Sequence, residues 1–545
     1  MMRAPGETSV DLASSWLPFS DSRQFKAQLW WRCSASVVAM LVCLTSASAQ
    51  TAAAGNSTIP KLADSMLRQA VPKDGALSLT GSMPQLASGG GWETTLSLVN
   101  TSSVSGEAML NLWGDPGGAL TLQFGLPQTS SAVTGSSLNE AIPANALLLL
   151  DTDAPESTAA QVGSAQLFTD GTIDGFAIFR YQPSGQEAVV PLEKRNAASY
   201  VLAFDNTRNL STGVAVANVS GTAADIPVTL RDETGASLGT SMLSVEANGH
   251  TSFMLSQSYP ATAGVRGTVE FDTPSGGQIS VLGLRSAPIQ GDTNAFAITT
   301  LPLLANVVAG TGSVAQVAAG FGWQTTFTLV NVGGTSASAH LAFFDNNGTA
   351  LPLSLSFPQT GTSASESAAD AVIPAGATLI ITANDTGASQ VGSAQLTTTG
   401  SIGAFAIFRY NPTGQEAVVP LQTGTANGYL LTYDNTSGLT NGVAVANQSS
   451  DEADIPVTVR DDIGATLSTT TITLAPNGHT MFLLTDPTSG FPMTAGKRGT
   501  VEFDTPGGGQ ISIVGLRSHQ IHAVGPTKGD FAVTTIPPLN TVAPI

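Results

Sequence analysis

The sequence predicts an all-β protein of four tandem immunoglobulin-like β-sandwich domains in an A-B-A-B repeat, after a signal peptide. Three observations predict this fold: a composition rich in turn residues, internal repeats on two scales, and short strands with alternating hydrophobicity. The 545 residues include 57 Gly and 30 Pro. A chain of this length implies several domains, and the Gly and Pro counts favour many turns over long helices.

The longer repeat relates two halves that lie about 230 residues apart. The segment GWETTLSLVN at 91–100 returns as GWQTTFTLVN at 322–331, and FAIFRY at 176–181 returns unchanged at 405–410. A third segment, RGTVEFDTP at 266–274, returns at 498–506. Repeats of this kind indicate one structural unit used more than once.

Each half is itself doubled. An apolar alternating strand leads into a turn that begins with Asp and ends with Gly in every copy, at 115–118, 232–235, 345–348 and 461–464. Asp caps such turns and Gly supplies a positive φ, so this spacing predicts hairpins. Each copy then closes on Pro-Leu. We expect sandwiches at 81–192, 193–305, 306–421 and 422–541.

The strands before these turns alternate with a period of two. Ala224, Ile226, Val228 and Leu230 share one face, which predicts a sheet with one buried side. Pro227 falls on the opposite face and suggests an edge strand. Short strands in units of about 110 residues are typical of immunoglobulin-like sandwiches. The pattern leaves open whether the four units form a rod or a compact array.

The N-terminal segment predicts export. An uncharged apolar run at 33–46 is followed by Ala47-Ser48-Ala49, so residues 1–49 are expected to be a signal peptide with a long n-region, cleaved near Gln50. An uncleaved anchor is the alternative, although the run is shorter than the roughly 20 residues that span a membrane. Residues 50–80 form a linker with a possible short helix near 59–70.

The compartment follows from this leader. Both cysteines, Cys33 and Cys43, lie inside it, so the mature chain is expected to lack disulfides and Cys-ligated metal. We expect a secreted or cell-surface protein with no membrane span in the mature chain. The net charge of −19 repels phosphate backbones, which excludes nucleic acid as a partner.

The phrases GGGWETTLSLVN, GFAIFRYQPSGQEAVVPL and YVLAFDNTRNLSTGVAVAN resemble tandem β-sandwich repeat proteins secreted by environmental bacteria, mostly of unassigned function. The resemblance covers nearly all of residues 81–541. It implies an exported protein and supplies no catalytic residues. The likeness to immunoglobulin modules is one of architecture, because their Cys…Trp…Cys core is absent.

No catalytic motif stands out, and we expect a protein that is not an enzyme. The sequence contains neither a G-x-S-x-G elbow nor H-E-x-x-H. His250 and His479 occupy one repeat position in a turn, where a loop-orienting role is expected and replacement by Ala should change stability only slightly. His519 and His522 could coordinate a metal ion, but no third ligand lies nearby in the sequence. The favoured interpretation places both histidines in a solvated loop.

Calcium is a weak possibility in an acidic exported protein. Asp151, Asp153 and Glu156 cluster in the segment DTDAPE, and hard cations prefer clustered oxygens. Solvated turn carboxylates are the favoured interpretation. No other cofactor is expected.

One arginine recurs in every copy, and these four residues are the main binding candidates: Arg180, Arg285, Arg409 and Arg517. In copies one and three the returning strand carries Glu187 or Glu416, so a cross-strand Arg–Glu pair is expected. An anion-binding role is the alternative.

Trp113 is the remaining binding candidate. It is out of phase with the core positions of its strand and is expected to make a surface contact, whereas Trp92 and Trp323 are in phase and are expected in the core. The expected function is adhesion, surface structure or spacing, with a surface glycan or matrix protein as partner. A carbohydrate-binding module is the alternative, and a hydrolase comes third. The sequence does not predict the oligomeric state.

Overall fold

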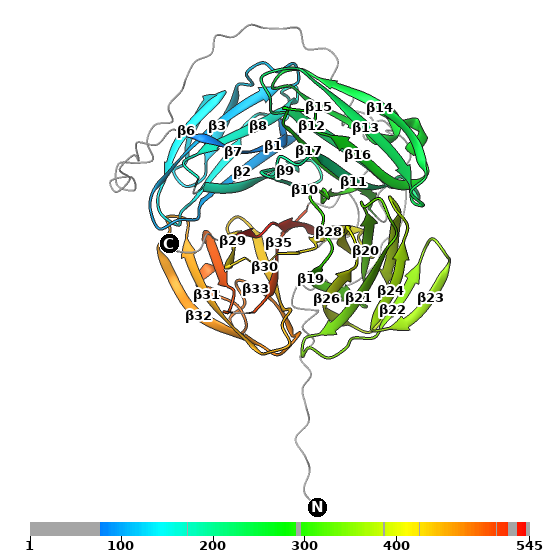
Figure 1. Ribbon diagram of the computed structural model, residues 1–545. Helices are drawn as coiled ribbons and strands as arrows, with labels where there is room; N and C mark the ends of the chain where they lie inside the picture. The colour runs from blue at the N-terminus through cyan, green and yellow to red at the C-terminus, as the bar shows by residue number, and fades with distance from the viewer. Residues whose placement is uncertain are drawn as a thin grey trace, which may run out of the picture.

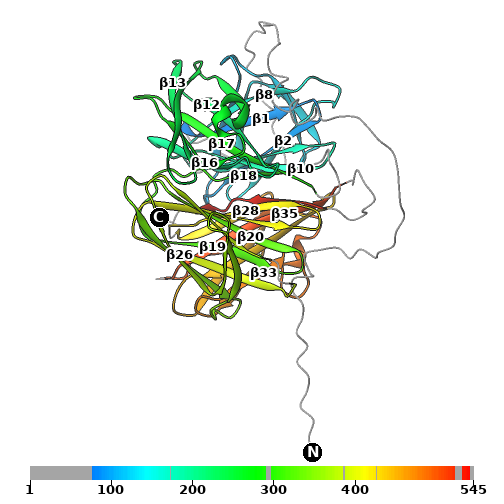
Figure 2. The ribbon, with the colours of Figure 1, turned by 90° about the vertical axis from the view of Figure 1, so that its right-hand side faces the viewer.

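The computed structural model describes residues 77–171, 173–289, 296–384, 387–424, 426–507, 509–521 and 531–540. The predicted signal peptide and the possible helix at 59–70 lie outside these residues. The described chain forms eight antiparallel sheets that face each other in pairs, as four sandwiches arranged around a common centre (Figures 1 and 2). The predicted all-β fold of tandem β-sandwich repeats is confirmed. No described helix is long and apolar enough to cross a membrane.

Sandwiches 1 and 3 each combine a four-stranded and a six-stranded sheet. In sandwich 1 these are β1 (Ser78–Ser88), β8 (Gln161–Thr169), β3 (Gly106–Gly114) and β6 (Ser137–Ile142), then β10 (Gln186–Pro191), β9 (Ile173–Tyr181), β2 (Trp92–Asn100), β7 (Leu147–Thr152), β4 (Leu122–Leu126) and β5 (Ser131–Gly135). In sandwich 3 they are β19 (Thr311–Ala319), β26 (Gln390–Thr398), β21 (Ala337–Asp345) and β24 (Ala368–Ile373), then β28 (Gln415–Pro420), β27 (Ile402–Tyr410), β20 (Trp323–Asn331), β25 (Thr378–Ala383), β22 (Leu353–Phe357) and β23 (Thr362–Glu366).

Sandwiches 2 and 4 keep the same core strands but lack the added hairpin. Sandwich 2 has β11 (Ser199–Asp205), β16 (Arg266–Asp272), β13 (Ala224–Asp232) and β14 (Ser237–Val245), then β15 (His250–Met254), β12 (Ser211–Asn218), β17 (Ile279–Pro288) and β18 (Phe296–Leu301). Sandwich 4 has β37 (Leu539–Asn540), β29 (Gly428–Asp434), β34 (Arg498–Asp504), β31 (Ala453–Asp461) and β32 (Thr466–Leu474), then β33 (His479–Leu483), β30 (Leu439–Asn447), β35 (Ile511–Gln520) and β36 (Phe531–Ile536).

These two copies have short helical turns between the fifth and sixth shared strands: α2 (Leu255–Ser258) and η2 (Pro260–Thr262) in sandwich 2, and η3 (Pro492–Thr494) in sandwich 4. The eight shared strands have one order in all four copies, which confirms that they are versions of one unit. The second strand pairs with the fifth and the third with the sixth, as in immunoglobulin domains. The first and seventh strands exchange places relative to that fold, because the first pairs with the sixth and the seventh with the second.

The alternation seen in the sequence places the core. Ala224, Ile226, Val228 and Leu230 of β13 are all buried, and the residues between them are not. The expectation of an edge strand at Pro227 was wrong, since β13 lies between β14 and β16. The proline is tolerated there because β16 pairs with β13 only from Val228 onward, so Pro227 lies beyond that ladder.

One contact joins each sandwich to the next. The turn after the third strand, which we call the corner turn, accepts a hydrogen bond from the first residue of its neighbour's fifth strand. It packs against the loop just before that strand, which we call the receiving loop. The four bonds run from His250 N to Asp115 O (3.1 Å), Thr378 N to Glu233 O (2.9 Å), His479 N to Asn346 O (3.2 Å) and Leu147 N to Asp462 O (3.0 Å). Because the fourth bond returns to sandwich 1, the array closes into a ring.

Glycine makes each of these contacts possible. In the corner turns Gly117, Gly235, Gly348 and Gly464 have φ between 77° and 87°, and a Cβ on any of them would lie 1.8–2.4 Å from a carbonyl oxygen of the receiving loop. In the first copy the glycine equivalent to those of the other three turns is therefore Gly117, one residue before the Gly118 that the sequence pattern indicated. Asp115 aligns with Glu233, Asn346 and Asp462, and Gly114 takes the place of the other aspartates.

The last strands of the sandwiches fill the centre of the ring. Neighbours among β10, β18, β28 and β36 contact each other in a closed circuit. The Thr300 hydroxyl donates to the carbonyl of Val189, and Thr535 donates to Val418 in the equivalent place. Hydrophobic clusters also continue from one sandwich into the next at all four boundaries. The ring is thus a single packed body.

Sandwiches 1 and 3 are the A units of the repeat, and sandwiches 2 and 4 are the B units. The two recurrent histidines lie inside the A–B interfaces, between sandwiches 1 and 2 and between sandwiches 3 and 4. His250 Nδ1 is 2.8 Å from Asp115 Oδ1 and its Nε2 is 3.0 Å from Gln85 Oε1. His479 makes the matching contacts with Asn346 Oδ1 at 2.9 Å and Gln316 Oε1 at 3.0 Å. The expected position in a surface turn was wrong, because both residues are 2% exposed and bridge two sandwiches, and we therefore expect more than a slight effect on stability.

Replacing His479 by Ala should lower the free energy of unfolding by about 2–4 kcal/mol, since it leaves the buried amide of Gln316 and the half-buried amide of Asn346 without their partner. Burial lowers the pKa of His479 to about 3. Its ordinary value is 6.5, so the unfolded chain takes up a proton first, and the wild type should lose stability as the pH falls from 6.5 toward 3. Urea unfolding at pH 7 and pH 4 measures both effects. Replacement of the exposed His340 serves as the control, and equal losses in the two variants would contradict the interface role.

Glu140 is a buried carboxyl on β6, in the four-stranded sheet of sandwich 1. It shares the core-facing side of β6 with Leu138 and Ile142, where the third copy has Ala371. Burial raises its pKa from 4.5 to about 7. The folded chain therefore holds the proton more tightly than the unfolded one, and stability is lost as the pH rises from 4.5 through 7.

Replacement of Glu140 by Gln should raise the free energy of unfolding at pH 8 by about 2–3 kcal/mol and leave it nearly unchanged at pH 4. Chemical denaturation at the two pH values tests this. The exposed Glu366 provides a control, because its change to Gln should matter by less than about 0.5 kcal/mol at either pH. A variant that is less stable than wild type at pH 8 would refute the assignment.

Candidate binding clefts between the sandwiches

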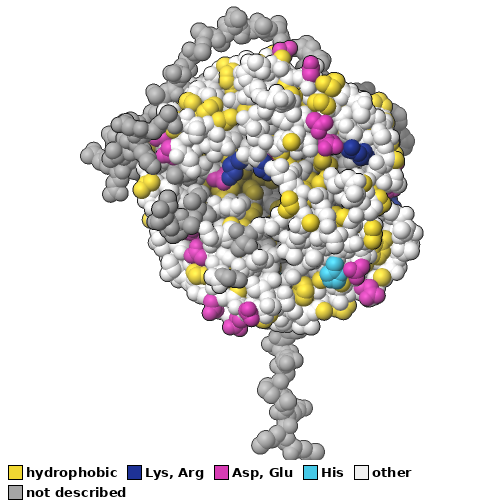
Figure 3. Space-filling model, viewed as in Figure 1, with side chains coloured by type: hydrophobic (Ala, Val, Ile, Leu, Met, Phe, Trp, Pro, Cys, Tyr) yellow, Lys and Arg dark blue, Asp and Glu magenta, His cyan; other side chains and the backbone are white. Residues whose placement is uncertain are grey.

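Two clefts occupy equivalent positions where a B sandwich precedes an A sandwich in the ring. Cleft 1–4 lies between sandwiches 1 and 4 and has a volume of about 170 Å³. Cleft 2–3 lies between sandwiches 2 and 3 and has a volume of about 290 Å³. Figure 3 shows a hollow near the middle of one face, lined by hydrophobic side chains and edged by basic ones. The duplication of the chain has therefore produced two versions of one interdomain site.

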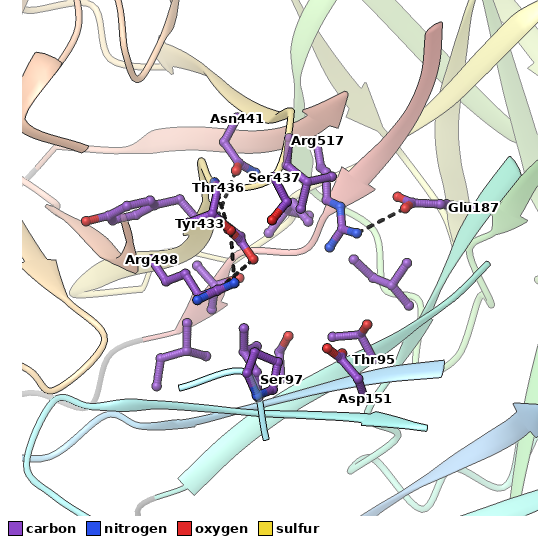
Figure 4. Close-up of a pocket in the computed structure, with 18 of the residues that line it drawn as sticks. Thr95, Ser97, Asp151, Glu187, Tyr433, Thr436, Ser437, Asn441, Arg498 and Arg517 are labelled. Carbon is purple, nitrogen blue, oxygen red and sulfur yellow. Dashed lines mark hydrogen bonds and ion pairs between the residues drawn. The ribbon is translucent and has the colours of Figure 1, made fainter. Parts of the chain in front are cut away.

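The wall of cleft 1–4 that belongs to sandwich 4 is held by hydrogen bonds of its own (Figure 4). Asp434 Oδ2 accepts from Arg498 Nε at 2.9 Å, and its Oδ1 accepts from the Thr436 amide at 2.9 Å and hydroxyl at 2.6 Å. Asn441 Oδ1 accepts from the Asp434 amide at 2.9 Å. These bonds fix the loop between β29 and β30 before any ligand arrives.

The opposite wall comes from β2 and β7 of sandwich 1. Thr95 and Asp151 are cross-strand partners, and Thr95, Ser97 and Asp151 lie below the sandwich 4 loop in Figure 4. Burial raises the pKa of Asp151, while a hydrogen bond from Thr95 and the charge of Arg517 oppose the rise. Asp151 Oδ1 is buried and has no hydrogen-bond partner within the described structure. It is therefore an acceptor ready for a ligand.

Glu93 adds a second carboxyl to this wall. Burial raises its pKa, the charge of Asp151 raises it further, and Arg180 and Arg517 act in the opposite direction. Its carboxylate accepts a hydrogen bond from Gln182. Glu93 lies two residues before Thr95, the cross-strand partner of Asp151, so the two carboxyls share one face of the sheet.

A buried glutamate joins the sandwiches at the end of each cleft. Glu416 of sandwich 3 is fully buried and receives Arg285 of sandwich 2 at 3.0 and 3.1 Å, together with Arg409 of its own hairpin at 2.6 Å. Arg409 also donates to the Pro288 carbonyl at 3.0 Å. We call these three side chains the Glu416 cluster. Its two arginines satisfy both carboxylate oxygens and link two sandwiches through one buried ion.

The Glu187 cluster repeats this arrangement between sandwiches 1 and 4, with looser contacts. Arg517 Nη2 lies 3.0 Å from Glu187 Oε1, but Arg180 Nε is 4.0 Å away, and Glu187 Oε2 has no partner among the described residues. His519 stands where sandwich 2 has Ala287, with its Nδ1 3.6 Å from Glu187 Oε1. Burial lowers the pKa of His519, although the charge of Glu187 opposes this.

The four arginines singled out from the sequence thus meet in two pairs. The cross-strand pairings of Arg180 with Glu187 and of Arg409 with Glu416 are present in the β-ladders. Sequence reasoning missed that Arg285 and Arg517 complete the clusters from the neighbouring sandwich. A signal was available, because the hairpins of copies two and four carry the arginine without a glutamate of their own.

The remaining candidates lie elsewhere. Trp113 is half-buried on β3 and lines neither cleft, and its Nε1 is buried without a hydrogen-bond partner in the described structure. Trp92 and Trp323 pack against the cores and contact Tyr181 and Tyr410, with ring centroids 4.9 and 5.1 Å apart.

The metal candidates are not brought together. Asp153 and Glu156 are exposed, and no group of three or more potential metal ligands forms within the described parts of the chain. His519 is buried in the Glu187 cluster, and His522 lies outside the described residues.

Replacing Glu416 by Ala should lower the free energy of unfolding by about 3–5 kcal/mol, because two arginines then face each other in a buried site without their counter-ion. Asp370, which pairs with His340 on the surface, provides the control, and its change to Ala should cost less than about 1 kcal/mol. Thermal and urea unfolding of both variants checks the prediction. A loss at Glu416 no larger than that at Asp370 would contradict it.

Comparison with known proteins does not place the chain in a family. No protein-family model matches the sequence, and no curated protein matches it. The functional argument therefore depends on the ring and its clefts.

Proposed function

We propose that the protein is an exported, non-enzymatic binding protein that acts in adhesion or surface structure, and that cleft 1–4 holds an uncharged saccharide unit of a surface glycan. The observation that carries this proposal is the unpartnered, buried Oδ1 of Asp151 opposite a preformed polar wall. Saccharide hydroxyls are hydrogen-bond donors, and such an acceptor favours a ligand of that kind.

The character of the cleft supports an uncharged ligand. Three guanidinium groups line it, but Arg498 is paired with Asp434 and Arg517 with Glu187, and Arg180 faces Glu93 across the ladder. Phe176, Ile178 and Leu149 supply an apolar surface between these charges. A ligand with many hydroxyls and a few C–H faces suits this lining better than a strongly charged one.

The ring argues against a role as a spacer. Sandwich 4 returns to sandwich 1 through the bond from Leu147 N to Asp462 O, so four copies add little length. Four interfaces instead hold the cleft walls at a fixed distance. A rigid cleft limits the entropy lost on binding, which favours recognition of a small ligand.

A non-enzymatic role is supported by where the histidines lie. Of the four in the described residues, His250 and His479 are inside interfaces, His519 is beside Glu187, and His340 pairs with Asp370 on the surface. None of them lines either cleft. A hydrolase remains the second candidate because one observation favours it: both Glu93 and Asp151 have a raised pKa, as a general acid requires.

The test is a glycan and matrix-protein array probed with the mature protein, followed by calorimetric titration of the best neutral glycan. The variant Asp151→Asn should weaken binding at least tenfold, while the surface variant Asp370→Asn leaves it unchanged. Binding that is insensitive to Asp151→Asn would overturn the assignment of the cleft. Mass spectrometry of the same glycan checks for cleavage, and turnover that disappears in both Glu93→Gln and Asp151→Asn would overturn the non-enzymatic proposal.

A further inference from the structure

Cleft 2–3 differs from cleft 1–4 in charge at three equivalent positions. The β2 and β20 strands correspond, so Glu93 is replaced by Gln324, and β7 corresponds to β25, so Asp151 is replaced by Thr382. In the loop after β29 or β11, Ser437 is replaced by Arg208. Each substitution makes cleft 2–3 more positive by one charge.

The other ionic groups at the two sites are the same. Asp205 pairs with Arg266 at 2.8 Å as Asp434 pairs with Arg498 at 2.9 Å, and Arg285 binds Glu416 as Arg517 binds Glu187. The three substitutions therefore make the net charge of cleft 2–3 more positive than that of cleft 1–4 by three units, while the other ion pairs match. Coulomb interactions within such partly enclosed sites are stronger than in bulk water.

Arg208 is the cation left free for a ligand. It lines cleft 2–3, is exposed, and has no ion pair or hydrogen bond within the described structure. Its φ is 51°, the same left-handed conformation as Ser437 in the equivalent loop. The loop conformation is thus shared by both clefts, and only the side chain at its tip differs.

Two buried hydroxyls provide further donors. Thr212 and Thr378 both line cleft 2–3, are 1% and 7% exposed, and have Oγ1 atoms without hydrogen-bond partners in the described chain. The equivalent residues in cleft 1–4 are Asn441, whose Oδ1 accepts a hydrogen bond from the Asp434 amide, and Leu147, whose side chain is apolar. At these two positions cleft 2–3 therefore offers buried hydroxyl groups, whereas cleft 1–4 has an amide and an apolar side chain.

We infer that cleft 2–3 is a second binding site, selective for a carboxylate-bearing saccharide such as a uronic acid unit. Arg208 would bind the carboxylate, since guanidinium groups form charge-assisted hydrogen bonds with it. The Thr212 and Thr378 hydroxyls would donate to the sugar oxygens, and Thr326, Thr382 and Asn384 complete the neutral polar lining. A volume of about 290 Å³ is close to the roughly 300 Å³ at which the range for small-molecule sites begins.

This inference is independent of the function proposed for cleft 1–4, because it depends on a different set of side chains. Calorimetric titration of the mature protein with trigalacturonate, and with maltotriose as an uncharged trisaccharide, tests it directly. We expect trigalacturonate to bind at one site per chain, at least tenfold more tightly than maltotriose binds at this cleft, and more weakly as salt rises.

Two variants assign that binding to cleft 2–3. Arg208→Ser installs the residue of the equivalent loop and should weaken trigalacturonate binding at least tenfold. The double variant Gln324→Glu with Thr382→Asp installs the carboxyls of cleft 1–4 and should do the same. Lys497→Ala removes an exposed cation outside both clefts and should leave the affinity unchanged.

Thermal unfolding should show that all three variants fold. Failure of trigalacturonate to bind the wild type, or equal binding by Arg208→Ser and wild type, would overturn the inference. An effect of Lys497→Ala as large as that of Arg208→Ser would also overturn it, because attraction by net charge alone would then explain the binding.

Discussion

The structure depends on one repeated interaction, in which the corner turn of each sandwich meets the receiving loop of the next. A backbone hydrogen bond is made at each of the four contacts, and a left-handed glycine allows the two backbones to approach closely. The contact is heterologous, since a different surface of each sandwich is used on its two sides. Heterologous contacts form a ring when the rotation closes and an open filament when it does not. Here four contacts close, and the last strands of all four sandwiches pack at the centre.

The A–B and B–A interfaces of the ring are built differently. At the A–B interfaces a buried histidine fills the space between the corner turn and the first strand of the A sandwich. At the B–A interfaces a buried glutamate gathers one arginine from each side and leaves a cleft beyond it. The alternation of two unit types therefore produces two tight interfaces and two open ones. A duplicated open interface can change its lining while its packing is maintained, and the replacement of the carboxyl of Glu93 by the neutral amide of Gln324 is an example.

Much of the fold could be predicted from the sequence, because repeats and period-two alternation report local constraints. Ala224, Ile226, Val228 and Leu230 are buried as their spacing indicates. The pairing of Arg409 with Glu416 also follows from their positions in one hairpin. What the sequence pattern could not supply is contact between units. Arg285 reaches Glu416 across 131 positions, and His479 reaches Asn346 across 133, so no local period connects them. The burial of both histidines, and hence the stability effect predicted for them, is a consequence of packing between consecutive sandwiches.

The central claim is that the four sandwiches close into one ring, and small-angle X-ray scattering of the mature protein tests it most directly. A single compact body of this size has a radius of gyration of about 23 Å. Four sandwiches in an open row would give roughly twice that value and a distance distribution with a long tail. A value near the compact one, unchanged between low and high salt, is the result that the ring predicts. An extended particle in dilute solution would contradict the closed interfaces and both clefts that depend on them.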